Sequence, residues 1–173
     1  MNNPKEKITI EPLKNETEYP IAYRLAQEIW DTTYKQILSP EQIKYMLDMM
    51  YAPEVIEKEL KEGIHFEFVK DNGMPIGFLS YGLYHGKDTM KLHKLYLSDI
   101  YHGRGIGSMM LQYVIAAAKK AGVRKLILNV NKENSRAMRA YERNGFKLVE
   151  KVKNDIGNGF YMDDFVMGID LEG

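Results

Sequence analysis

The sequence predicts an α/β fold in which helices pack around a mixed sheet. The chain has 173 residues, an ordinary length for the single domain that we expect to span residues 1–173. Apolar residues make up 45% and charged residues 28% of the chain, which is typical of a globular protein with a real core. Helical and strand-like patterns also alternate along the second half of the chain, as they do in α/β proteins.

The N-terminal half carries the signals for an edge strand, three helices and three antiparallel strands. Pro12 cannot donate a ladder hydrogen bond, which places the first strand at an edge. Ser39 before Pro40 is a helix start signal. The first helix is expected to bury one apolar face, formed by Ile21, Leu25, Ile29 and Trp30. The expected elements are strand 7–13, helices 17–36, 40–51 and 53–62, and strands 64–71, 75–84 and 89–98.

The C-terminal half alternates helix and strand before it ends in two strands. The segment 124–130 is nearly all apolar, so we expect it at the centre of the sheet. Gly122 and Gly145 are typical residues after a helix end, and a loop at 155–159 is expected to join the last two strands. The expected elements are helix 104–121, strand 124–130, helix 134–144, and strands 146–153 and 159–169.

A glycine-rich tract is the most informative feature of the chain. It reads His102-Gly103-Arg104-Gly105-Ile106-Gly107-Ser108 and lies between a predicted strand and a predicted helix. Glycines leave backbone N–H groups open to close approach. The unpaired N–H groups and the dipole of a helix N-terminus favour an anion, typically a phosphate. The tract therefore predicts binding of a phosphate-bearing cofactor.

The tract alone leaves more than one interpretation open. A Walker A loop is excluded, because no Lys precedes Ser108. A dinucleotide site requires a different glycine spacing and an acidic residue at the tip of the next strand, where this chain has Asn129-Val130-Asn131. The remaining alternative is a glycine turn that merely joins a strand to a helix.

A second motif downstream narrows the choice. Asn134, Ala137, Tyr141, Gly145 and Phe146 match the pattern Asn-x-x-Ala-x-x-x-Tyr-x-x-x-Gly-Phe. Together with the glycine tract, this motif makes the chain resemble the GNAT N-acetyltransferase superfamily, whose loop is usually Gln/Arg-x-x-Gly-x-Gly/Ala. The resemblance covers at least residues 64–169. The chain departs from the family at His102, where Gln or Arg is usual.

The resemblance implies a GNAT-type fold and acetyl-coenzyme A as co-substrate. The fold has a mixed, mostly antiparallel sheet, helices on both faces, and two splayed central parallel strands, here 89–98 and 124–130. The pantetheine arm enters between them. The implied cofactor-binding residues are Leu95, Tyr96, Leu97, Gly103, Arg104, Gly105, Ile106, Gly107, Ser108, Asn134 and Ala137. Asn134 is also a good helix cap, and Arg104 is as easily a solvated surface residue.

The resemblance also implies the catalytic residues. Tyr141 corresponds to the tyrosine that protonates the leaving thiolate of coenzyme A. His93 is near the position of the glutamate that takes the amine proton in related enzymes, and an imidazole can do this at neutral pH. His65, Glu67 and Tyr81 are alternative bases, as is water. The chain has no cysteine, so a cysteine acyl-enzyme is excluded and we expect direct transfer within a ternary complex.

The acceptor is expected to be a primary amine of a small molecule. Trp30 and Tyr34 lie four residues apart and so share a helix face, where they offer cation–π contact. An ordinary buried stripe is an equal alternative. The layout is similar, more loosely, to PaiA-type spermidine/spermine acetyltransferases. The alternatives are an N-terminal protein or peptide acetyltransferase and a non-catalytic acyl-coenzyme A-binding module.

Charge and hydropathy limit the remaining possibilities. Lys plus Arg equals Asp plus Glu, so a nucleic-acid partner is not expected. No apolar run reaches about 18 residues and no hydrophobic signal segment begins the sequence, so we expect a cytoplasmic protein without a membrane partner. We expect no metal, and a homodimer only because such dimers are common in the family.

Overall fold

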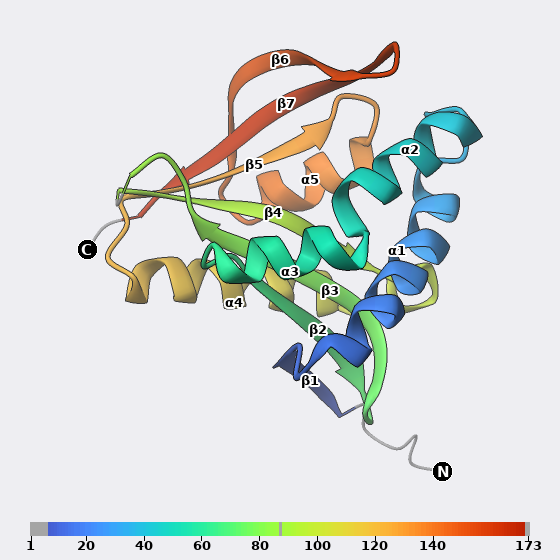
Figure 1. Cartoon of the computed structure of the whole chain (residues 1–173). Coiled ribbons are helices and arrows are strands. Elements are labelled where there is room, and N and C mark those ends of the chain that lie inside the picture. The colour runs from blue at the N-terminus through green and yellow to red at the C-terminus, as the bar shows by residue number, and fades with distance from the viewer. Residues whose placement is uncertain (1–6, 87, 172–173) are drawn as a thin grey trace. The chain divides into compact units, whose positions relative to one another are not determined.

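A computed structural model describes residues 7–86 and 88–171 (Figure 1). Within them, seven strands form one sheet in the order β1-β2-β3-β4-β5-β7-β6. The strands are β1 (Ile8–Pro12), β2 (His65–Asp71), β3 (Met74–Leu83), β4 (Thr89–Leu97), β5 (Lys125–Asn131), β6 (Lys147–Gly157) and β7 (Phe160–Asp170). The helices are α1 (Tyr19–Thr33), α2 (Pro40–Tyr51), α3 (Pro53–Lys61), α4 (Ile106–Lys120) and α5 (Ser135–Arg143), with short 3-10 turns at Glu16–Glu18 and Asp99–Tyr101.

The sheet is mixed and mostly antiparallel, which confirms the predicted fold class. The strands β4 and β5 run parallel, whereas β1 with β2, β5 with β7 and β6 with β7 are antiparallel. The parallel ladder covers four residue pairs and ends at Leu92 and Leu128. Beyond that point β5 still pairs with β7 as far as Asn131 and Asp164. The β4–β5 ladder thus ends before either strand does, and the predicted splay of the two strands stays a prediction.

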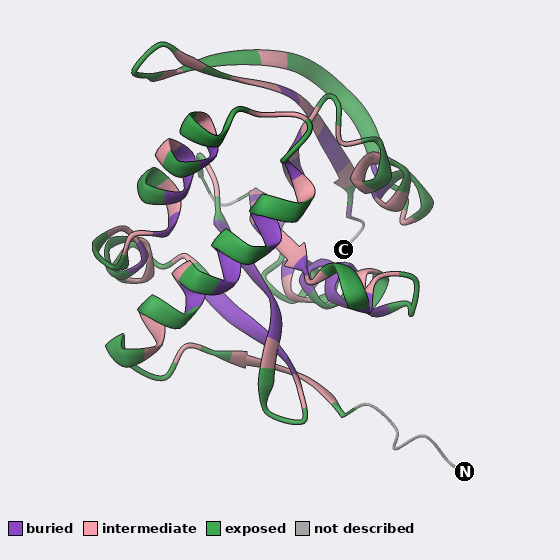
Figure 2. Ribbon diagram, turned by 90° about the vertical axis from the view of Figure 1, so that its right-hand side faces the viewer, coloured by how far each residue is buried: buried purple, intermediate pink, exposed green. Residues whose placement is uncertain are grey.

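The chain divides into two compact units. One contains the residues up to Ser80 together with Lys94–Ile106, and the other contains Tyr81–His93 together with the residues from Gly107 onward. The single domain over residues 1–173 stays a prediction. Figure 2 shows helices that are buried on one side and exposed on the other. Among the described residues, each helix is too short or too polar to cross a membrane.

In the first unit, the buried face of α1 differs from the predicted one. Ile21 is 47% exposed, so its predicted burial is wrong. Ala22 and Ala26 are fully buried instead, beside Leu25, Ile29 and Trp30. Positions 22, 25, 26 and 29 follow the helical spacing of one face, and residue 21 lies about 100° away from residue 22 around the axis.

The bounds of α1 are also shorter than the predicted 17–36. The N–H groups of Ile37 and Leu38 both donate to the carbonyl of Tyr34, so the chain turns there. Ser39 must be extended before Pro40 and has φ −68° and ψ 153°. Its side chain accepts from the N–H of Gln42 at 3.1 Å, which is the predicted start of α2.

In the second unit, the last hairpin is longer than predicted. The expected loop 155–159 is wrong in its first half, because β6 continues to Gly157 and Asp155 pairs with Tyr161. Gly157, Asn158 and Gly159 all have positive φ and make the turn. The core of this unit contains residues of α4 and β5 with at most 1% exposure, namely Met110, Val114, Ala118, Leu126 and Leu128.

Candidate active site

The glycine tract forms an open loop that leads directly into α4. Gly103 and Gly105 have φ of +80° and +81°, so the helix begins at Ile106 and not at the predicted residue 104. A Cβ added at Gly103, Gly105 or Gly107 would meet no atom within 4 Å. The protein therefore leaves the space at these Cβ positions open. Binding of the coenzyme A diphosphate at this helix start stays a prediction.

His102 is bound to the end of β4. Its Nε2 lies 2.9 Å from the carbonyl oxygen of Leu97, and a carbonyl can only accept, so Nε2–H is the donor. The other ring nitrogen, Nδ1, lies 3.2 Å from a carboxylate oxygen of Asp99. This contact is an ion pair when the ring is protonated, but its geometry is not that of a hydrogen bond. His102 thus holds the start of the loop to the strand.

Arg104 is exposed and lies over an aromatic ring. Its guanidinium carbon is 5.1 Å from the centre of the Tyr101 ring. The Tyr101 hydroxyl donates to Asp71 at 2.7 Å, so the ring beneath the guanidinium is fixed from β2. A role of Arg104 in binding diphosphate stays a prediction.

The strand residues of the predicted cofactor site lie at the end of β4. Leu95 and Tyr96 are half-buried and Leu97 is buried. A Cβ at Gly77 of β3 would lie 2.5 Å from the carbonyl oxygen of Tyr96. Glycine is therefore required at position 77 for β4 to keep this close approach.

The second motif forms α5 and its caps. The side chain of Asn134 accepts from the N–H of Ala137 at 3.3 Å, so its capping role is present. Tyr141 is 9% exposed, and its ring centre lies 5.9 Å from that of Phe146. The cofactor contacts of Asn134 and Ala137 and the acid role of Tyr141 stay predictions.

Asn144 connects α5 to the start of α4, which the sequence did not indicate. Its amide nitrogen lies 3.4 Å from the Ser108 hydroxyl and donates to the Ala140 carbonyl at 2.8 Å. Its amide oxygen accepts from Gln112 at 3.1 Å. The helix that carries Tyr141 is therefore tied to the first two turns of the predicted phosphate-binding helix.

Aromatic rings from α1, α2 and the sheet gather in the first unit. The ring centres of Trp30 and Tyr34 are 4.8 Å apart, as their spacing led us to expect. The Tyr34 hydroxyl lies 3.0 Å from the hydroxyl of Tyr96 on β4. Other ring contacts extend the cluster to Tyr51, Phe66 and Phe78. The predicted acceptor residues thus lie against the strand that carries predicted cofactor residues.

A buried lysine lies inside this aromatic cluster. The Lys94 side chain is 3% exposed, and its ammonium group is 3.0 Å from a carboxylate oxygen of Glu59 on α3. The ammonium also lies over the rings of Tyr51 and Phe66, at 5.1 and 5.8 Å. Burial lowers the pKa of Lys94, and Glu59 opposes this shift. In the sequence, the signal for this buried lysine is its place at a position of β4 where the alternation of the strand calls for an apolar residue.

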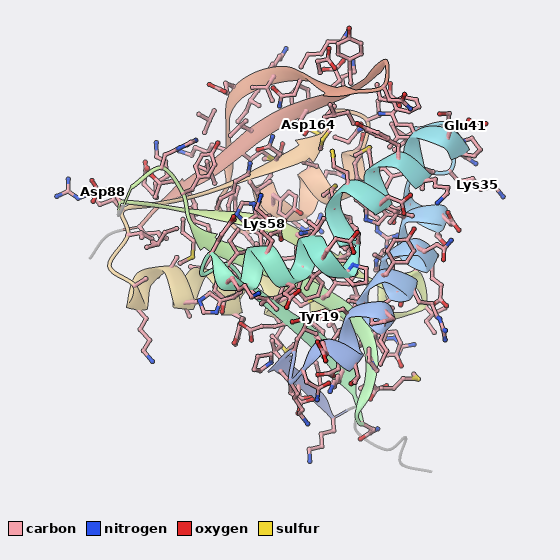
Figure 3. All side chains as sticks on the ribbon, in the orientation of Figure 1. Tyr19, Lys35, Glu41, Lys58, Asp88 and Asp164 are labelled. Carbon is pink, nitrogen blue, oxygen red and sulfur yellow. The ribbon has the colours of Figure 1, made fainter. Side chains whose placement is uncertain are left out.

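A groove opens beside the cluster at the turn between α1 and α2. Its volume is about 590 Å³, and its lining residues are Asp31, Thr32, Lys35, Leu38, Pro40 and Ile43. Asp31, which follows Trp30 in the sequence, brings a carboxylate to this groove. Lys35, labelled in Figure 3, brings a positive charge to the same groove.

The second unit holds a buried carboxylate, Asp164 on β7 (Figure 3). Asp164 is 4% exposed, and burial raises its pKa. Its nearest donor is the amide of Asn129 on β5, at 3.5 Å. His93 on β4 is half-buried, and its role as base stays a prediction. Among the described residues, no group of three or more His, Cys, Asp or Glu is arranged to hold a metal.

Comparison with known proteins identifies one family. Residues 22–146 match the model of the Acetyltransferase (GNAT) family. A spermidine N(1)-acetyltransferase of Thermoplasma acidophilum is 29% identical over 91% of this chain and 93% of its own length. An uncharacterised N-acetyltransferase of Mycobacterium bovis is 36% identical over 46% of this chain, and the chain spans about half of that relative, 50% of its length.

Solved structures share the fold. The PaiA N-acetyltransferase of Thermoplasma acidophilum, in complex with coenzyme A, superimposes with a TM-score of 0.80 at 26% identity, over 95% of this chain and 99% of that one. A GCN5-related N-acetyltransferase structure from Rhodopseudomonas palustris superimposes with a TM-score of 0.78 at 18% identity, over 98% and 100% of the two chains.

Proposed function

Because this chain belongs to the Acetyltransferase (GNAT) family, we propose that it transfers the acetyl group of acetyl-coenzyme A to a primary amine of a polyamine such as spermidine. The observation that carries the choice of acceptor is the similarity to a spermidine acetyltransferase over nearly the whole length of both chains. Other relatives match over shorter stretches, as the Mycobacterium bovis protein does over 46% of this chain, and carry no argument about the acceptor.

The reaction requires three contributions from the protein. The amine must lose its proton, since an ammonium with a pKa of about 10.4 is not a nucleophile at neutral pH. The carbonyl oxygen must be stabilised as the amine nitrogen forms its bond to the acetyl carbon. The carbon–sulfur bond then breaks, and the thiolate must be protonated.

The residues of the chain can be assigned to these steps. The N–H groups at 103–108 hold the diphosphate, and the β4 backbone near Leu97 supports the pantetheine and the oxyanion. Tyr141 gives its proton to the sulfur, and His93 or water takes the proton of the amine. The chain contains no cysteine to carry an acyl group, so the transfer is direct and both substrates are bound together.

The groove at the turn between α1 and α2 suits a cation with an aliphatic chain. Its lining combines the carboxylate of Asp31, which attracts an ammonium group, with the apolar side chains of Leu38, Pro40 and Ile43. Trp30 and Tyr34 pack against each other and are only 1% and 6% exposed, so they favour a buried stripe over a cation–π contact with the acceptor. The groove therefore supports a polyamine as acceptor.

The experiment measures free-thiol release from acetyl-coenzyme A with four classes of acceptor, and identifies the acetylated product by mass spectrometry. The classes are polyamines, amino acids, aminoglycosides and N-terminal peptides. We expect the highest kcat/KM for polyamines. Preference for peptides would make the chain an N-terminal acetyltransferase, and tight coenzyme A binding without transfer to any amine would make it an acyl-coenzyme A-binding module.

A further inference from the structure

Asp164 and its neighbour Asp163 lie in opposite surroundings, although they are adjacent on β7. Asp163 is 40% exposed and forms an ion pair with Lys132. Asp164 is 4% exposed, and no cationic side chain of the described residues lies within 4 Å of its carboxylate. The alternation of a strand explains the opposite surroundings. It does not explain why the buried position carries a charged group.

The hydrogen bonds of Asp164 leave most of its carboxylate unused. An ionised carboxylate offers about four acceptor sites. From the part of the chain that the structure describes, the one hydrogen bond to the Asp164 side chain comes from the Asn129 amide at 3.5 Å, the limit of hydrogen-bond distance. A buried carboxylate with so little compensation is unfavourable unless a cation joins it.

The nearest lysine does not serve as that cation. Lys91 on β4 attracts Asp164, but its ammonium group lies 4.9 Å from the centre of the Tyr84 ring and not at the carboxylate. Burial lowers the pKa of Lys91, so its own charge is weakened in this position. Lys91 is therefore held at an aromatic ring and forms no ion pair with Asp164.

The neighbouring side chains complete a site for an ammonium group. Asp164 lies directly opposite Asn131 in the β5–β7 ladder, so Asn129, Asn131 and Asp164 share one face of the sheet. The Asn131 side chain already accepts from the N–H of Glu133. The amide oxygen of Asn129 and the free carboxylate oxygen of Asp164 remain as acceptors for a group that has three N–H donors.

We propose that Asp164, together with Asn129, binds a primary ammonium group of the amine acceptor. The identity of this amine as the acceptor rests on the proposed function, whereas binding of the ammonium group can be tested without acetyl transfer. The site selects cationic acceptors over neutral ones, because a neutral group would leave the buried charge uncompensated.

The test is calorimetric titration of spermidine into the protein with coenzyme A bound, a complex that cannot transfer an acetyl group. In Asp164→Asn the shape is kept and the charge is lost, and we expect at least tenfold weaker spermidine binding with coenzyme A affinity unchanged. Asp163→Asn is the matched control and should bind spermidine like the wild type. A control titration with sodium chloride, at the same ionic strength as the spermidine solution, measures nonspecific counter-ion binding. Heat that appears with spermidine and not with sodium chloride comes from a specific site.

Two results overturn the proposal. In the first, Asp164→Asn binds spermidine as tightly as the wild type. In the second, Asp163→Asn and Asp164→Asn weaken binding equally, which would indicate general electrostatic attraction. If spermidine is acetylated but Asp164→Asn is unaffected, this inference fails alone. If binding depends on Asp164 but no amine is acetylated, the ammonium site stands and the proposed function fails.

A second variant tests whether removing a neighbouring positive charge strengthens spermidine binding. Lys91→Gln removes a positive charge that attracts Asp164 without contacting it, so we expect tighter spermidine binding. Weaker binding in this variant contradicts the proposal.

Thermal unfolding without ligand gives a further check, because removing an uncompensated buried charge should raise the Tm of Asp164→Asn at pH 8. A lowered Tm would make Asp164 a structural group and overturn the proposal.

Discussion

The hydroxyl groups of Tyr34 and Tyr96 lie 3.0 Å apart and join the end of α1 to β4. Tyr34 belongs to the predicted acceptor surface and Tyr96 to the predicted cofactor strand. Trp30 packs against both rings, with centres 4.8 Å from Tyr34 and 5.7 Å from Tyr96. We propose that a change in acceptor contacts at Tyr34 is transmitted through Tyr96 to the strand that is predicted to hold the pantetheine arm.

A double-mutant cycle tests this link. We expect Tyr34→Phe and Tyr96→Phe each to raise the KM for the amine several-fold, because each removes one partner of the same hydrogen bond. The double variant should be little worse than either single one, with a coupling free energy of about 1 kcal/mol from kcat/KM. Additive effects would show that the two hydroxyls act independently.

Tyr141→Phe tests the proton donor to the leaving thiolate. The variant should lower kcat by about 10²-fold or more, a typical contribution of general acid catalysis, and leave the KM for acetyl-coenzyme A nearly unchanged. Steady-state thiol release across a range of pH measures both. Tyr161→Phe is the control, since Tyr161 is 48% exposed on β7. Wild-type turnover in Tyr141→Phe at every pH would remove this residue from the mechanism.

Gly107→Ala separates stability from cofactor binding. Gly107 lies in the first turn of α4, has no positive φ, and has open space around its Cβ position. Alanine should stabilise the helix by up to about 1 kcal/mol, measured by urea unfolding. The same methyl group should obstruct the diphosphate and raise the Kd for coenzyme A about tenfold. Unchanged affinity would place the diphosphate elsewhere.

Glu59→Gln tests the buried charge pair with Lys94. The substitution leaves a buried ammonium without its counter-ion and should destabilise the fold by about 2 kcal/mol at pH 7. Glu62→Gln is the control, because it disrupts an exposed pair with Lys58 and should cost less than about 0.5 kcal/mol. Urea unfolding measures both variants.

The destabilisation should depend on pH with a defined sign. Burial lowers the pKa of Lys94 from its usual 10.5, so the folded state binds fewer protons than the unfolded state between the lowered value and 10.5. Stability from this group therefore rises with pH over that window. Loss of Glu59 lowers the pKa of Lys94 further, so the deficit of Glu59→Gln should shrink between pH 7 and pH 9.5. A constant deficit would show that Lys94 does not titrate there.

The sequence predicted those parts of the fold that depend on local signals. Ser39 and Pro40 started α2 as expected, since capping involves neighbouring residues. The predictions were wrong where contacts between residues far apart in the sequence determine the structure. The exposure of Ile21 depends on which helix face meets the sheet, and the long β6–β7 hairpin depends on pairing across the ladder.

The same distinction holds for the candidate site. Glycine spacing at 103–107 predicted an open loop at a helix start, because φ and close approach are local properties. The Lys94–Glu59 pair joins residues 35 positions apart, and so does the Asn129–Asp164 contact. Lys94 follows Met90 and Leu92 at the two-residue spacing of one strand face, but no pattern in the sequence identified its partner.

The central claim is acetyl transfer from acetyl-coenzyme A to a polyamine nitrogen. The most direct measurement incubates the protein with acetyl-coenzyme A and spermidine and follows free thiol and acetylated spermidine together, by absorbance and mass spectrometry. We predict that both products rise in equal amounts, and that neither forms when spermidine is left out. Thiol release without any acetylated amine, or no reaction with spermidine while another acceptor class is acetylated, would contradict the account.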